Sequence, residues 1–107
     1  MSIMQSEELR GVAFQIILES GDARKMIHEA FDLMRETLFL EAGAKLDVAK
    51  DVIIRAHDSQ SGLLQKYASG INFEIDILMV HAQDHLMTTM MLNEIAIEML
   101  YLYKKIG

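Results

Sequence analysis

Hydrophobic residues recur every three or four positions along almost the whole chain, which places them on one face of an α-helix. Three long stretches carry this pattern, and Gly70 follows the second of them, at a position where helices commonly end. The pattern predicts an all-α protein with helices at about residues 6–37, 40–68 and 72–105. Because short connections make consecutive helices antiparallel, we expect one up-down-up three-helix bundle over residues 1–107.

The third predicted helix carries two hydrophobic stripes, whereas packing against one neighbouring surface requires only one. Both stripes follow the alternating three- and four-residue steps of a coiled coil. The first stripe is almost wholly apolar and comprises Ile75, Met79, Ala82, Leu86, Met90, Asn93, Ile97 and Leu100. The second stripe includes polar residues and comprises Ile77, His81, Asp84, Thr88, Met91, Ile95 and Leu102. Two stripes indicate that this helix is buried on two sides, through self-association.

Titratable side chains interrupt this apolar helix at His81, Asp84 and His85. His81 and His85 are one helical turn apart, so their rings face the same way. A carboxylate on an apolar stripe must be paired, protonated or bound to a cation, because an isolated buried charge is costly. Copies of Asp84 placed ~4 Å apart by a symmetry axis would repel by about 4 kcal/mol per pair at an effective dielectric of about 20. A shared cation or shared protons would then be required.

From spacing alone, other interpretations of the histidines remain open. A lone histidine on an apolar face is more often a core residue than a reactive one, and a pair at positions i and i+4 resembles half of a zinc site. The metalloprotease motif HExxH needs Glu directly after the first His, and Ala82 stands there instead. The sequence also lacks the glycine-rich motifs that bind nucleotides and the Glu-x-x-His pairs of diiron bundles.

Composition narrows the choice of partners and compartment. Sixteen acidic and ten basic residues give a net charge of −6, and the basic residues are scattered, so nucleic acid is not an expected partner. Cysteine is absent, which excludes disulfide and thiolate chemistry. No apolar run approaches the roughly 18 residues of a membrane-spanning helix, and the acidic amino terminus does not resemble a secretion signal. We expect a cytoplasmic protein without membrane insertion.

The motif VHAQDHLMT at residues 80–88, followed by LYKK at 102–105, resembles the lactose, cellobiose and diacetylchitobiose class of enzyme IIA. These are components of the bacterial phosphoenolpyruvate-dependent sugar phosphotransferase system. Further matches cover nearly the whole chain and are Gly21-Asp22-Ala23-Arg24, Ala56-His57, Gln60, Leu63, Leu64 and Gln65. The chain departs from the family at residues 37–44, where the family has a short polar turn containing glycine.

The resemblance implies that His81 is the phosphorylated residue, carrying the phosphoryl group on Nε2 as tele-phosphohistidine. The implied donor is HPr, and the implied acceptor is a cysteine of the cognate enzyme IIB, which serves uptake of a β-disaccharide such as lactose, cellobiose or diacetylchitobiose through the membrane enzyme IIC. The resemblance also implies a homotrimer with a central parallel coiled coil of third helices, in which copies of Asp84 bind one Mg²⁺ per trimer. A neutral imidazole suits the role of His81, because it keeps a nucleophilic lone pair.

The remaining polar residues receive lesser roles. His85 is a candidate to donate a hydrogen bond to the phosphoryl group, whereas Gln83 is expected on the opposite side of the helix and Thr88 is expected to bond a carbonyl one turn back. We expect His57 to be buried or at an interface and His28 to lie at the surface. The alternative functions are a non-catalytic oligomeric helical scaffold or binding protein and, more remotely, a metal-storage bundle.

Overall fold

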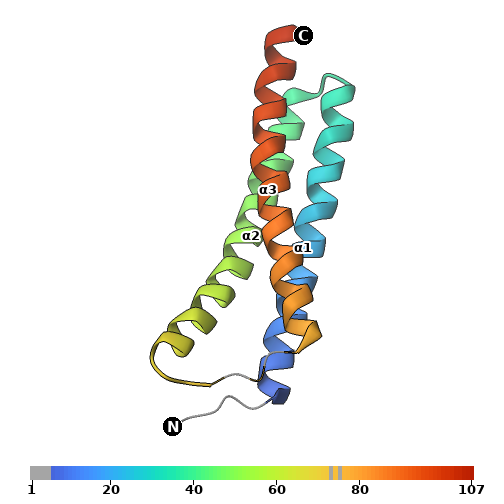
Figure 1. Ribbon diagram of the computed structural model, residues 1–107. Coiled ribbons are helices and arrows are strands. Elements are labelled where there is room, and N and C mark those ends of the chain that lie inside the picture. The colour runs from blue at the N-terminus through green and yellow to red at the C-terminus, as the bar shows by residue number, and fades with distance from the viewer. Residues whose placement is uncertain (1–5, 73, 75) are drawn as a thin grey trace.

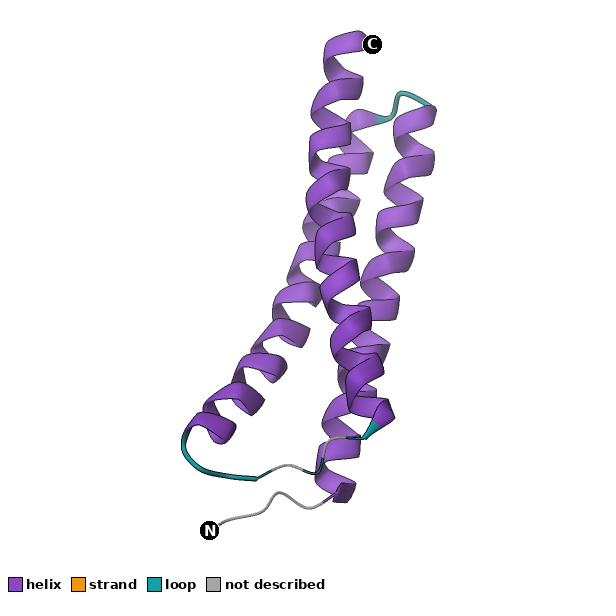
Figure 2. Ribbon diagram, viewed as in Figure 1, coloured by secondary structure: helices purple, strands orange, loops and turns teal. Residues whose placement is uncertain are grey.

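The computed structural model is an elongated bundle of helices that measures 58 × 20 × 17 Å. It describes residues 6–72, 74 and 76–107. Its helices, each of 30 residues, are α1 (Ser6–Arg35), α2 (Phe39–Ala68) and α3 (Ile77–Ile106). The chain runs up α1, down α2 and up α3, so that α1 and α3 are parallel (Figure 1), and the described part contains no strand (Figure 2). The predicted all-α up-down-up three-helix bundle is confirmed.

The buried positions of α1 and α3 alternate between steps of three and four residues. Those of α2 follow the same spacing except that Val52 and Ile53 are both buried and no position is buried between Ala56 and Leu63. This spacing keeps each buried stripe facing its neighbours along the full length of nearly parallel helices. On α1 the buried residues are Leu9, Ala13, Ile16, Ser20, Ala23, Ile27, Ala30 and Met34. On α3 they are Met79, Ala82, Leu86, Thr89, Asn93, Ala96 and Leu100. Small residues recur in both sets, and they let the helix backbones approach closely.

The first stripe predicted on α3 is correct at five positions and wrong at two. Met90 and Ile97 were expected to be buried, but they are half-buried, and the core holds Thr89 and Ala96 instead. The smaller side chains fit between closely spaced helices, whereas the larger ones pack at the margin. Ile75, another predicted member, lies outside the described residues.

The connection between α1 and α2 depends on Thr37. The sequence predicted that the first helix extends to residue 37, but α1 ends at Arg35, because Thr37 adopts a positive φ of 63°. The Leu38 amide donates to the Leu33 carbonyl at 2.9 Å, and the Thr37 amide donates to the Met34 carbonyl at 3.1 Å. This is the helix ending in which glycine usually occupies the left-handed position. The unusual sequence of this turn therefore places a β-branched residue in an unfavourable conformation.

The third helix begins at Ile77, five residues after the predicted start at residue 72. Asp76 accounts for the later start because it is the N-cap residue of α3. Its backbone is extended, and its side chain accepts a hydrogen bond from the Met79 amide at 3.1 Å. Arg10 of α1 lies 3.5 Å from the same carboxylate. Residues 73 and 75 of the predicted helix lie outside the described part of the chain. The second helix agrees with its prediction of 40–68 to within one residue.

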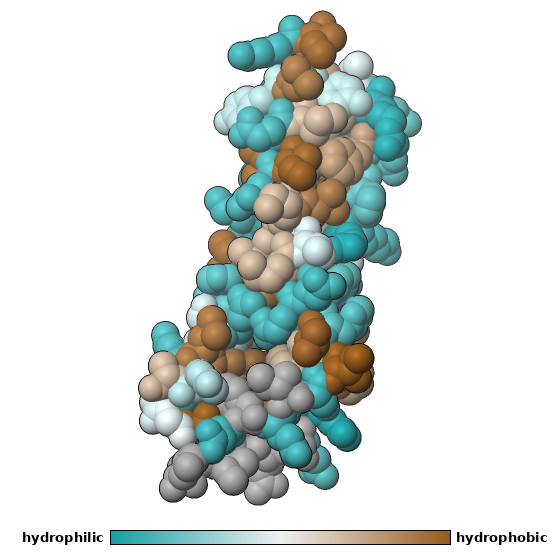
Figure 3. All heavy atoms as spheres, viewed as in Figure 1, coloured by the Kyte–Doolittle hydropathy of each residue, from teal (hydrophilic) through white to brown (hydrophobic). Residues whose placement is uncertain are grey.

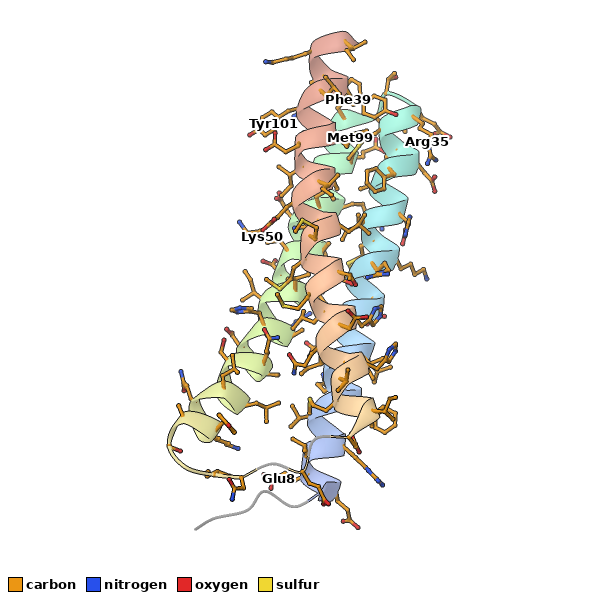
Figure 4. The ribbon with its side chains drawn as sticks, in the orientation of Figure 1. Glu8, Arg35, Phe39, Lys50, Met99 and Tyr101 are labelled. Carbon is orange, nitrogen blue, oxygen red and sulfur yellow. The ribbon has the colours of Figure 1, made fainter. Side chains whose placement is uncertain are left out.

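Apolar side chains also close the end of the bundle where α2 begins. The rings of Phe39 and Tyr103 are 6.4 Å apart, and both pack with Met99 against the buried core. Figure 4 shows Phe39 and Met99 at this end, whereas Lys50 and Tyr101 project away from the bundle. These contacts tie the carboxyl-terminal turns of α3 to the start of α2.

A second group of apolar side chains on α3 is exposed in the single chain. Its largest members are Ile77, Val80, Met87, Met91, Ile95, Leu102 and Ile106. Figure 3 shows hydrophobic groups along this side of the molecule, interrupted by hydrophilic ones. Even so, none of the helices in the described ranges is both long and apolar enough to cross a membrane. Four of these residues, Ile77, Met91, Ile95 and Leu102, belong to the second stripe predicted from the sequence.

We predict that Thr37→Gly stabilises the protein by about 0.5–1 kcal/mol. Glycine removes a left-handed strain of roughly 1–2 kcal/mol, and part of that gain is offset by the greater entropy of the unfolded chain. Urea unfolding at one fixed protein concentration measures the change. Thr37→Ala is the matched control, because alanine retains the Cβ that causes the strain. Equal stabilisation by both variants would show that the positive φ is not the cause.

Candidate functional site

The two histidines of the motif form a stacked pair on α3. The ring centroids of His81 and His85 are 5.8 Å apart, and their planes differ by 7°. His81 is exposed, whereas His85 is half-buried against α1. The structure therefore brings together the two rings that the sequence placed on one face. It leaves the first ring open to another molecule.

Gly21 is the α1 residue that faces His85 of this pair. A Cβ built on Gly21 would lie 3.8 Å from Nε2 of His85, which is ordinary van der Waals contact. Alanine would therefore fit, but a longer side chain would lie over the imidazole. The absence of a side chain at this position keeps the α1 side of the histidine pair uncovered.

Arg24 lies one turn beyond Gly21 on the same helix and binds two hydroxyls of α3. Its Nε and Nη2 atoms donate to Oγ1 of Thr89 at 3.1 and 3.0 Å, and Nη2 also donates to Oγ1 of Thr88 at 2.6 Å. The Thr88 hydroxyl donates in turn to the Asp84 carbonyl at 2.9 Å, the bond expected from the sequence. The sequence analysis gave Arg24 no role. Arg24 is three residues after Gly21, and this spacing could have indicated that both residues lie on the same face of α1.

The surroundings of His85 favour its neutral form. Burial lowers the pKa of His85 below the ordinary value of 6.5, the charges of Arg24 and His81 lower it further, and Asp84 opposes them. A neutral imidazole has one N–H group that can donate and one nitrogen that can accept. At neutral pH, His85 can therefore donate a single hydrogen bond toward a group held by its neighbour.

Asp84 is exposed and forms no ion pair with the described residues of its own chain. The described residues contain no cluster of three or more histidine, cysteine, aspartate or glutamate side chains that could hold a metal ion. A single carboxylate does not make a cation site. Asp84 could bind a metal ion only together with ligands from other chains.

The other polar residues of the motif and its surroundings lie away from the histidine pair. Gln83 accepts a hydrogen bond from Gln60 of α2, which confirms that it faces the opposite side of α3. His28 is exposed, as expected. His57, expected to be buried or at an interface, is exposed in the single chain. The prediction that His57 is buried is therefore wrong for the single chain, and a place at an interface between chains stays a prediction.

An apolar groove lies on the Gln83 side of α3. It has a volume of about 450 Å³ and is lined by Leu9, Gln60, Leu63, Leu64, Tyr67, Met79, Val80 and Gln83. The lining is mostly apolar, and it does not include His81. The candidate site is therefore an exposed surface between α1 and α3.

Comparison with known proteins gives consistent matches over nearly the whole chain. The family described as "PTS system, Lactose/Cellobiose specific IIA subunit" matches residues 11–104. The lichenan-specific phosphotransferase enzyme IIA component of Bacillus subtilis is 41% identical over 101 residues, which cover 94% of this chain and 92% of that protein.

Solved structures show the same fold. The crystal structure of PtcA from S. mutans has a TM-score of 0.93 and 59% identity, covering 94% of this chain and 99% of that one. A chain in the solution structures of the IIA(Chitobiose)-HPr complex of the Escherichia coli phosphotransferase system has a TM-score of 0.77 and 30% identity. That match covers 94% of this chain and 98% of the other.

We predict that an NMR titration of the His85 ring gives a pKa below 6.5. His81→Gln should raise this value, because it removes a neighbouring ring whose positive charge opposes protonation of His85. A value at or above 6.5 in the unmodified protein would contradict the burial seen here. The resonances of His28, on the exposed side of α1, provide an internal check that the fold is unchanged.

The lowered pKa of His85 also has a defined effect on stability. The pKa of His85 is higher in the unfolded chain than in the folded chain. As pH falls, His85 is therefore protonated in the unfolded chain before it is protonated in the folded chain. The contribution of His85 is therefore most favourable above about pH 6.5 and decreases as pH falls from there toward the folded-state pKa.

Proposed function

This chain belongs to the lactose/cellobiose-specific IIA family of the sugar phosphotransferase system, and we propose that it carries a phosphoryl group on Nε2 of His81. The family makes it a phosphotransferase component of bacterial sugar uptake. One observation supports the choice of His81: its ring is the exposed member of a stacked pair of imidazoles.

In the proposed reaction, the lone pair of His81 Nε2 attacks the phosphorus of a phosphorylated donor. A nitrogen–phosphorus bond forms as the bond between phosphorus and the donor breaks, and the donor keeps the electron pair of that bond. The return step is analogous, with a thiolate of the acceptor attacking the same phosphorus and releasing the neutral imidazole. Such transfers depend mainly on positioning and charge stabilisation. A ring fixed on a helix suits that requirement.

We assign His85 the role of supporting the phosphoryl group. Its ring lies parallel to that of His81, and its lowered pKa favours the neutral ring before the phosphoryl group arrives. The N–H group of a neutral ring can donate to a phosphoryl oxygen without adding a positive charge that repels a cationic donor surface. His85 would thus fix the orientation of the phosphoryl group on His81.

The proposed partners are HPr as donor and the cognate enzyme IIB as acceptor, with the membrane enzyme IIC acting later in uptake. The related IIA(Chitobiose) protein forms a complex with HPr, which supports the first assignment. The net charge of −6 favours partners with a basic surface. Relatives are named for lichenan, lactose and chitobiose, so we propose a β-linked disaccharide as the transported sugar.

We further propose a homotrimer in which the α3 helices form a central parallel coiled coil. The exposed apolar residues of α3 support it, because Ile77, Met91, Ile95 and Leu102 repeat at coiled-coil spacing on one face. The exposure of such large apolar side chains in one chain is explained if copies of α3 cover them.

Asp84 lies on the same stripe, and in the trimer its copies would meet at the axis. Three carboxylates brought together are compatible with Mg²⁺, a cation that prefers oxygen ligands. A bound ion would neutralise their mutual repulsion. We propose Asp84 as this ligand, with one ion per trimer.

We predict that His81→Gln abolishes phosphorylation while leaving the helical fold intact. The ring is exposed, so its replacement removes the nucleophile without opening the core. Transfer of ³²P from phosphoenolpyruvate through enzyme I and HPr should label the unmodified chain with acid-labile, base-stable phosphate, and labelling of the variant should fall to background. His28→Gln is the matched control, because it changes an exposed histidine of α1 and should be labelled normally. Normal labelling of His81→Gln would eliminate the assignment.

We predict that Asp84→Leu leaves the trimer intact and allows it to persist at about tenfold lower protein concentration. The substitution replaces facing carboxylates with an apolar contact. Sedimentation velocity measures the oligomeric state. Ile95→Asp provides the opposite control, because it adds a charge to the same stripe and should dissociate the trimer. Monomers of Asp84→Leu at concentrations where the unmodified chain is a trimer would contradict the proposed axis.

A further inference from the structure

Arg24 differs from the other arginines of the chain in the charge of its partners. Three of the four arginines lie within 3.5 Å of a carboxylate. Within the described residues, Arg24 forms no such ion pair and donates only to the hydroxyls of Thr88 and Thr89. Hydroxyl groups satisfy the hydrogen bonds of a guanidinium, but they carry no net charge. Among the described residues, therefore, no carboxylate pairs directly with the positive charge of Arg24.

The same contacts fix the position of that charge. Three hydrogen bonds hold two nitrogens of the half-buried guanidinium, and their main acceptor, the Thr89 hydroxyl, belongs to a fully buried residue. The remaining nitrogen, Nη1, has no hydrogen-bond partner among the described residues. A long side chain loses much rotamer freedom when it is held in this way. A surface arginine that served only solubility would not be fixed to two hydroxyls of another helix.

The fixed charge lies beside the histidine pair. Arg24 is one helical turn from Gly21, where an added Cβ would lie 3.8 Å from Nε2 of His85, and Arg24 binds Thr88, which is three residues from His85 on α3. The charge of Arg24 acts on His85. A phosphoryl group on the adjacent His81 would add a charge of about −2 to this region. The site thus has a preorganised positive charge before the negative group arrives.

We propose that Arg24 is a positioning residue for phosphoryl transfer, whose fixed guanidinium favours the phosphorylated state of His81. The inference rests on the proposed function and assigns one more residue to it. Arg24 remains protonated throughout, and no bond to it forms or breaks. Its charge, held against α3 by the hydroxyls of Thr88 and Thr89, would shift the phosphoryl equilibrium between the donor and this chain toward this chain.

The test measures the equilibrium constant for transfer from phospho-HPr to the full-length chain, with ³¹P NMR to quantify the two phosphohistidines. Arg24→Gln should lower this constant about fivefold to tenfold, whereas Arg24→Lys, which keeps the charge, should stay within about twofold of the unmodified chain. The deficit of Arg24→Gln should shrink at 1 M salt, because the Debye length falls to about 3 Å. Arg24→Met is a second neutral variant, used if Arg24→Gln fails to fold.

The outcomes separate this inference from the function on which it rests. Failure to phosphorylate the unmodified chain would overturn the proposed function itself. If the unmodified chain is phosphorylated and the neutral variants have the same equilibrium constant, only the role of Arg24 is overturned. An equal decrease of the equilibrium constant in Arg24→Lys and Arg24→Gln would also overturn the role of the charge. It would show that Arg24 acts only through its three hydrogen bonds. Thr89→Ser, which keeps the acceptor hydroxyl, serves as the control for the contact.

Discussion

The alternating spacing of buried residues is the constraint on which the rest of this structure depends. Because α1 and α3 both bury positions that alternate between three and four residues apart, they pack against each other in one register. That register places Gly21 beside His85 and Arg24 beside Thr88 and Thr89. A shift of one turn would put a large side chain over the imidazole and would separate Arg24 from both hydroxyls. The core therefore determines the geometry of the site as well as the stability of the fold.

Much of the fold could be predicted from the sequence, because helical periodicity is a local signal that persists over 30 residues in each helix. The ends were less predictable. Asp76 is a good helix-capping residue, but the hydrophobic residues before it suggested an earlier start. Thr37 was the opposite case, since nothing in its chemistry favours the left-handed conformation that ends α1. The residues at which these helices begin and end depend on tertiary packing, which the local sequence pattern does not reveal.

The candidate site was predictable in part for a related reason. His81 and His85 share a face because they are four residues apart on one helix, so their stacking follows from local geometry. The contacts of Arg24 join residues 64 and 65 positions apart and depend on the register between two helices. The same holds for the half-buried state of Met90 and Ile97, which depends on how closely the neighbouring helices approach. Periodicity identifies the face of a residue but not its partner on another helix.

His81 lies on the outer face of the regular helix α3, and this location limits how binding partners can approach its ring. The helix presents one ring from one side, and the described part of the chain around it consists of regular helix with backbone hydrogen bonds that leave little room for rearrangement. In the proposed function, the donor and the acceptor would therefore approach the ring of His81 from the same side, and each would exclude the other while it is bound. Such a carrier works as a shuttle that visits its two partners in turn, and fast release by each of them matters as much for throughput as the chemical step.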